Sequence, residues 1–128
     1  MEITGLEFKR IKLSAQATQK LGLFKSRTGL TPNIACRLAL GFSISDDNNL
    51  TLDLHTEETG QEINRYTLLG EHEDALLTLF LEWCRINNIT PNDYYKYFKA
   101  HINRGVEKIV NRVKSIDQLI NLLPKDMK

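Results

Sequence analysis

The side chains best suited to chemistry in this sequence are three histidines and two cysteines. His55, His72 and His101 fall in separate segments, and neither Cys36 nor Cys84 has a second ligand at the spacing of a zinc site. Both cysteines lie in apolar helical patterns, which is typical of free buried thiols in a reducing compartment. We therefore expect no bound metal and no disulfide.

One acidic run could in principle serve acid–base catalysis. Residues 71–74 read Glu-His-Glu-Asp, but they stand where a predicted helix begins, and carboxylates there complement the helix dipole. The sequence contains no GxSxG, Walker or GxGxxG motif, and neither cysteine has an obvious basic partner. We expect a protein that is not an enzyme and that uses no cofactor.

Basic side chains are the remaining candidates, and they are unevenly distributed. The net charge is only +1, yet residues 1–40 carry seven basic and two acidic side chains, residues 41–82 one and ten, and residues 83–128 nine and four. Segregated charge can present a basic surface on a nearly neutral protein, which favours a nucleic-acid partner. The candidate DNA contacts are Lys9, Arg10, Lys12, Lys20, Lys25, Arg27, Arg37, Arg104, Lys108 and Arg112.

The first 45 residues predict a strand followed by two helices. Residues 6–13 alternate imperfectly between apolar and polar side chains, which indicates a short strand. Ser14 can cap a helix that Gly29 ends, and Thr31-Pro32 is a typical start for the next helix. That second helix is apolar all round apart from Arg37, which predicts that it forms the core of an oligomer.

The order of strand, helix, glycine turn and helix is that of a ribbon-helix-helix unit. In such units two chains pair their strands into a ribbon that enters the major groove of DNA. Most of the basic candidates in the unit are lysines, which act as point charges and favour the DNA backbone over base edges. The strand could instead pair with residues 50–68 of its own chain.

The rest of the chain is predicted to be mainly helical. A hairpin is expected over residues 46–70, with a strand in the alternating stretch 50–55 and a return strand in EINRYTLL (62–69), and helices are expected over 71–88 and 91–114. On the second of these helices one flank carries Arg104, Lys108 and Arg112, a second candidate DNA surface. A last short helix runs from a Ser115 cap towards Pro124.

The expected architecture is one domain over residues 1–128, mainly α with a small β component and oligomeric. It comprises a ribbon-helix-helix-like unit (1–45), the hairpin (46–70) and a helical bundle (71–124). No apolar run approaches the ~18 residues of a membrane span, and no signal peptide is apparent.

Three stretches resemble the DndE family of DNA phosphorothioation systems, in which sulfur replaces a non-bridging phosphate oxygen. They are SRTGLTPNIACRLALGFSI (26–44), NRYTLLGEHEDALLTL (64–79) and AHINRGVEKI (100–109). The resemblance implies a cytoplasmic homo-oligomer, expected to be a tetramer, that does not itself perform the sulfur chemistry. It also implies double-stranded DNA as a ligand, including nicked duplex, and the DndC and DndD subunits as partners.

Two other functions remain open at this stage. One is a sequence-specific ribbon-helix-helix transcriptional regulator. The other is a protein-interaction adaptor of the modification complex, whose acidic middle segment docks on partner subunits.

Overall fold

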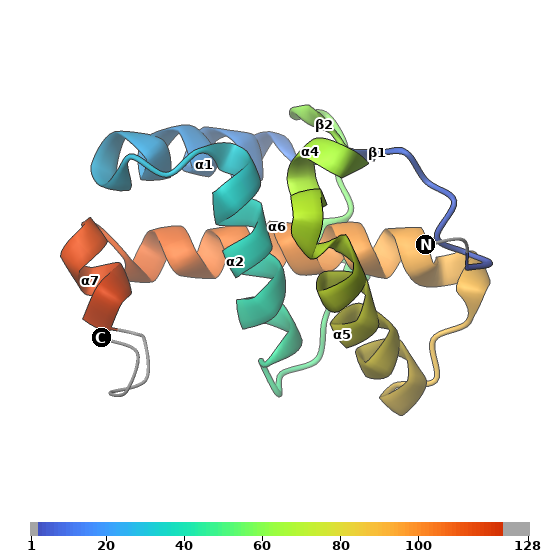
Figure 1. Cartoon of the computed structure of the whole chain (residues 1–128). Coiled ribbons are helices and arrows are strands. Elements are labelled where there is room, and N and C mark those ends of the chain that lie inside the picture. The colour runs from blue at the N-terminus through green and yellow to red at the C-terminus, as the bar shows by residue number, and fades with distance from the viewer. Residues whose placement is uncertain (1–2, 122–128) are drawn as a thin grey trace.

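One long helix forms the centre of the protein, and the other elements pack around it. The computed structural model describes residues 3–121. Figure 1 shows α6 crossing the molecule, with α1 along one side and α2, α4 and α5 lying across it. The elements are β1 (Arg10–Lys12), α1 (Ala15–Thr28), α2 (Pro32–Ile44), α3 (Leu52–His55), β2 (Glu62–Asn64), α4 (Arg65–Leu69), a 3-10 turn (Gly70–His72), α5 (Glu73–Ile86), a 3-10 turn (Pro91–Asp93), α6 (Tyr94–Arg112) and α7 (Ile116–Asn121).

The predicted strand, helix and helix at the N-terminus are confirmed. The Ser14 hydroxyl accepts a hydrogen bond from the Ala17 N–H at 3.0 Å and caps α1. Gly29 ends α1 in the left-handed conformation with φ 79°, a backbone geometry that favours glycine. Thr31 precedes α2 as predicted, but its hydroxyl donates to Asn33 Oδ1 at 2.6 Å and does not cap the helix.

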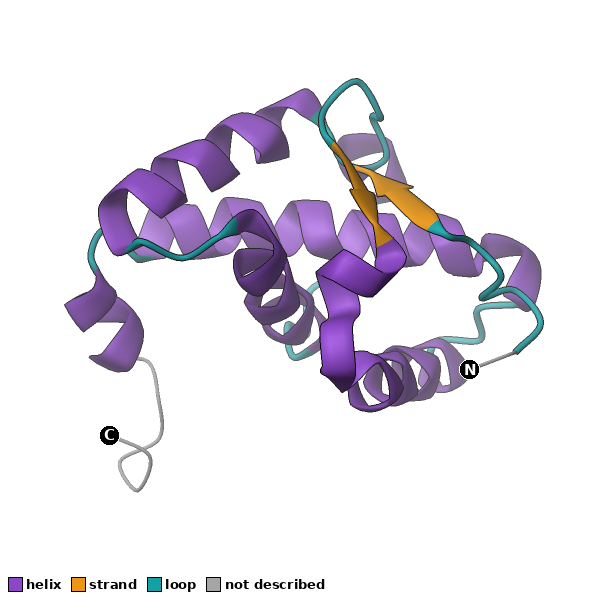
Figure 2. Cartoon of the chain, turned by 45° about the horizontal axis from the view of Figure 1, so that its top comes forward, coloured by secondary structure: helices purple, strands orange, loops and turns teal. Residues whose placement is uncertain are grey.

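The strand β1 pairs with β2 of the same chain. The pairing is antiparallel and joins Ile11 to Ile63, as the two arrows in Figure 2 show. Hydrogen bonds from the Leu13 N–H to the Gln61 carbonyl and from the Arg65 N–H to the Lys9 carbonyl extend it on either side. One edge of β1 is therefore occupied by β2, and this edge cannot pair with a strand of a second chain to form a ribbon.

The predicted hairpin over residues 46–70 is wrong. Residues 52–55, predicted as part of a strand, form the short helix α3, and the return strand is only Glu62–Asn64 before α4 begins. Asn64 Oδ1 accepts the Tyr66 N–H at 2.8 Å, which starts a helix where a strand was expected. The alternation of leucines with polar residues was misleading, because alternation indicates a strand only when the apolar side chains face a core. Leu54 is 75% exposed and faces no core.

The helix α6 is continuous, as the apolar stripe across Gly105 predicts. It is buried all round through its middle, from Phe98 to Val106, because α1, α2 and α3 pack against it and the Phe80 and Trp83 rings of α5 contact Phe98 and His101. Gly105 makes the closest of these contacts possible. A Cβ atom at this position would overlap the Ala39 carbonyl group and would lie 2.8 Å from Ala39 Cα.

The last predicted helix is present as α7, and the Ser115 hydroxyl accepts the Gln118 N–H at 3.3 Å. Its predicted continuation to Pro124 lies outside the described residues. Within residues 3–121 no helix is both long and apolar enough to cross a membrane.

Candidate nucleic-acid interface

Six of the ten predicted DNA contacts lie on two consecutive elements, in or beside β1 and on α1. We call this surface the β1–α1 edge. Five of its side chains are carried by exposed positions in or next to β1 or near the end of α1, and Lys20 lies half-buried in the middle of α1. Its members are Lys9, Arg10, Lys12, Lys20, Lys25 and Arg27.

The charges of the β1–α1 edge are largely unneutralised. Among the six residues, within the described part of the chain, only Arg10 has an ion pair, with Glu62 at 3.7 Å, and both partners are well exposed. An exposed pair of this kind contributes about 0–1 kcal/mol and exchanges readily with another anion. Lys20 Nζ donates to the amide oxygen of Asn111 at 3.0 Å, which fixes its position without cancelling its charge.

The dimensions of the β1–α1 edge suit duplex DNA. Measured along the chain, a helix of 14 residues and a strand of three add up to about 30 Å, since each residue adds ~1.5 Å or ~3.3 Å respectively, and the two elements meet at an angle (Figure 2). One turn of B-DNA is about 34 Å long. In Figure 1 β1 and α1 follow each other along the same side of α6.

The second candidate surface, the flank of α6, does not exist as an exposed basic face. Arg104 is 5% exposed and points into the protein, which corrects its predicted place on a solvent-facing flank. Its guanidinium donates to the Ser43 hydroxyl at 2.9 Å, the Ser43 carbonyl at 2.7 Å and the Asn48 carbonyl at 2.9 Å. Lys108 is paired with Asp46, and Arg112 is left as the exposed member.

Arg37 also has a structural position. Its guanidinium reaches from α2 to the end of α4, where Nε donates to the Leu68 carbonyl at 2.7 Å and a terminal nitrogen to the Thr67 carbonyl at 3.2 Å. Cations at a helix C-terminus satisfy carbonyl groups that have no partner within the helix. Arg37 therefore joins α2 to α4 and stands apart from the β1–α1 edge.

Burial holds the two cysteines and one histidine of the core neutral. Burial raises the pKa of Cys36 and of Cys84 to about 12, so both thiols stay protonated and poorly nucleophilic. Burial, with a smaller effect of the Arg104 charge, lowers the pKa of His101 to about 3. His101 Nδ1 lies 2.7 Å from the Ser43 hydroxyl, and the Trp83 ring packs edge-on against the imidazole with 4.2 Å between the ring centroids.

Within residues 3–121 no three His, Cys, Asp or Glu side chains gather closely enough to hold a metal ion.

Two neighbouring residues of interest were missed by the sequence analysis. Arg65 and Tyr66 were placed inside a predicted strand, where nothing distinguishes them from ordinary surface residues. In the structure Arg65 is 7% exposed, and its guanidinium donates to the carbonyl oxygens of Leu6 and Phe8 and pairs with Glu73 at 2.9 Å. The only signal available was that Arg65 is the single basic residue between positions 41 and 82.

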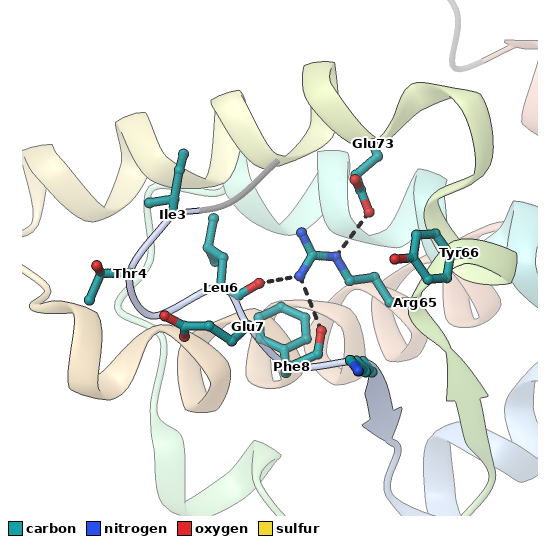
Figure 3. A pocket seen from close by; sticks show the side chains of 9 residues that line it. Ile3, Thr4, Leu6, Glu7, Phe8, Arg65, Tyr66 and Glu73 are labelled. Atoms are coloured by element: carbon teal, nitrogen blue, oxygen red, sulfur yellow. Dashed lines mark hydrogen bonds and ion pairs between the residues drawn. The ribbon is translucent and has the colours of Figure 1, made fainter.

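Arg65 and Tyr66 border a pocket of about 530 Å³ next to β1. Figure 3 shows Arg65 tying the N-terminal segment to α5, with Tyr66 at the side of the pocket. The other lining residues come from the N-terminal segment and the start of α5: Ile3, Thr4, Leu6, Glu7, Phe8, Lys9 and Glu73.

Comparisons with known proteins agree with this fold. Residues 10–117 match the family described as DNA sulphur modification protein DndE. The crystal structure of DndE from Escherichia coli B7A, involved in DNA phosphorothioation modification, is 27% identical over 77% of this chain and 95% of that chain, with a TM-score of 0.65. A G21/24K mutant of DndE, 24% identical over 80% of this chain and 97% of that chain, has the same fold with a TM-score of 0.64. No curated protein matched the chain. The resemblance stated from the three sequence stretches is therefore confirmed, and the chain belongs to the DndE family of DNA sulphur modification proteins.

Proposed function

We propose that this protein is a non-enzymatic, DNA-binding accessory subunit of a DNA phosphorothioation system. The observation that carries the proposal is the β1–α1 edge, where six basic side chains lie on consecutive elements and, among described residues, only Arg10 has an ion pair. A surface of this kind neutralises phosphates and releases their counterions. The family to which the chain belongs acts in DNA sulphur modification, so DNA is the polyanion that best fits the surface.

The residue types at the β1–α1 edge favour contact with the DNA backbone. Four of the six are lysines, which lack the planar fork that arginine uses to recognise a guanine edge. We therefore propose binding with little sequence preference, with nicked duplex among the ligands. A discrimination of ~10³ or more between duplex sequences would instead indicate a transcriptional regulator.

A catalytic role finds little support in the side chains. The two thiols are protonated and buried, and His55, His72 and His101 lie in α3, a 3-10 turn and α6. We propose that the sulfur chemistry belongs to other components of the system. DndC and DndD are the proposed partners in the cytoplasm.

An oligomer, with a tetramer as the expected form, is part of the proposal. The outer side of α2 is apolar although the inner side already packs against α6. Ile34 is 39% exposed, and Leu38 and Phe42 are half-buried on the same helix. Burying this side against a second copy would remove apolar area from water and would repeat the β1–α1 edge in one assembly.

The location of the DNA contacts can be tested by charge removal. Changing Lys9, Arg10 and Lys12 together to Gln should lower duplex affinity about 100-fold or more near 0.1 M salt, since each phosphate contact contributes roughly eightfold there. Glutamine keeps most of the side-chain length, so the fold should be unaffected. Fluorescence anisotropy with a labelled duplex measures the affinity.

The matched control removes the same charge elsewhere. Arg85 on α5, Lys96 on α6 and Lys114 just after α6 are all exposed. Their joint change to Gln should lower affinity by less than about threefold, because long-range attraction between exposed charges is screened at this salt concentration. Equal losses in the two triple variants would show that net charge, and not the β1–α1 edge, determines binding.

A further inference from the structure

Tyr66 stands out because its aromatic ring has no partner within the described part of the protein. The ring is 70% exposed, and no ring contact or side-chain hydrogen bond involves it. The other three tyrosines all pack on aromatic neighbours: Tyr94 on Phe80, Tyr95 on Phe8 and Tyr97 on Trp83. A large aromatic side chain left in water is the kind of residue that a ligand covers.

The backbone that carries Tyr66 is held firmly. The Asn64 side chain accepts its N–H at 2.8 Å, and the preceding residue, Arg65, bonds two carbonyl oxygens and Glu73 at once. The guanidinium of Arg65 also lies over the Phe8 ring at 5.1 Å. An exposed ring on a fixed backbone loses little conformational entropy when a ligand stacks on it.

The ring borders the pocket of about 530 Å³, a size in the range of small-molecule sites. Figure 3 shows the Tyr66 hydroxyl directed towards the pocket. The two carboxylates that line it are already engaged, since Glu7 accepts the Gly5 N–H and Glu73 pairs with Arg65. Lys9 adds an exposed cation to the lining, and its carbonyl oxygen accepts the Arg65 N–H, so the pocket adjoins the first residue of the β1–α1 edge.

We propose that Tyr66 is a stacking platform for one unpaired DNA base, held at the β1 end of the β1–α1 edge. This inference rests on the proposed DNA binding and adds to it a residue that distinguishes DNA structures. A base stacks on an aromatic ring whatever its identity, while Lys9 reaches the phosphate beside it. Only DNA with an unstacked base, as at a flap, gap or frayed nick, can use the platform, because bases of an intact duplex keep their faces covered.

The test compares two DNA ligands of the same sequence. One is an intact duplex, and the other carries a single unpaired 2-aminopurine at a flap. Changing Tyr66 to Ala should lower affinity for the flap DNA about tenfold, the effect of losing one base–aromatic stack, and should change affinity for the intact duplex less than twofold. Binding by the unchanged protein should also quench the 2-aminopurine fluorescence, and binding by the Tyr66→Ala variant should not.

Two further variants separate stacking from other roles of the side chain. Tyr66→Phe keeps the ring and should keep both the flap affinity and the quenching. Tyr66→Leu keeps apolar bulk without a π face and should behave as the alanine variant does. Equal affinity of all four proteins for the flap DNA would overturn the inference, and so would equal losses on the two ligands. If the unchanged protein bound neither the flap DNA nor the intact duplex, the proposed function itself would be refuted.

Discussion

Changing Gly105 to Ala should lower the free energy of unfolding by about 3 kcal/mol, although alanine is the better helix former. The added Cβ would overlap the Ala39 carbonyl group, which is backbone and cannot rotate away. The helices α2 and α6 would have to separate along the most extensive contact in the fold, and overpacking of this kind typically costs 1–3 kcal/mol or more. Urea unfolding followed by circular dichroism measures the effect.

Gly22 provides the control for the Gly105 prediction. It also lies within a helix, α1, but a Cβ there meets no atom within 4 Å. Gly22→Ala should therefore raise stability by about 0.5–1 kcal/mol, the ordinary gain from replacing glycine within a helix. A Gly105→Ala variant that also gained stability would show that α2 and α6 do not approach each other as the structure describes.

Changing Arg104 to Met should lower the free energy of unfolding by about 3 kcal/mol and leave the affinity of the folded protein for DNA unchanged. Three hydrogen bonds from the guanidinium would be lost, and the Ser43 and Asn48 carbonyl oxygens would lose a charged donor inside the protein. Arg104→Lys should lose nearly as much, because one ammonium group cannot replace the arginine fork. Unfolding in urea at equal protein concentration compares the variants.

Arg112 is the control on the same helix. It is exposed, so Arg112→Met should change stability by less than about 0.5 kcal/mol. If Arg104→Met instead kept full stability and lost DNA affinity, Arg104 would be a ligand contact and its interior position would be wrong.

Local signals in the sequence were enough to predict the helical part of the fold. Ser14, Gly29 and Pro32 each act through their own backbone or side chain, so the ends of α1 and the start of α2 could be located without knowledge of distant contacts. The continuous α6 was predictable for the same reason, because its apolar stripe repeats at the period of a helix. The family resemblance was carried by residues in these same segments.

Features that depend on distant residues could not be predicted in this way. The strands β1 and β2 have three residues each, so neither is long enough to show an alternating pattern. They lie about 50 positions apart in the sequence, so no turn motif joins them. Arg104 shares a helical flank with Arg112, but only the fold reveals that Ser43 and Asn48 cover it. The ten candidate DNA contacts were chosen residue by residue, and in the structure six of them lie in or beside β1 and on α1. Tyr66 was missed because its isolation is a property of the fold.

The central claim, that the β1–α1 edge binds the DNA backbone, is tested most directly by the salt dependence of binding. The logarithm of the association constant for an intact duplex should fall linearly with the logarithm of salt concentration, with a slope of about −5 if all six basic residues contact phosphates. The triple change of Lys9, Arg10 and Lys12 to Gln should reduce the slope to about −2 to −3. Absence of binding at low salt, or a slope that stays the same when these three charges are removed, would contradict DNA binding by the β1–α1 edge.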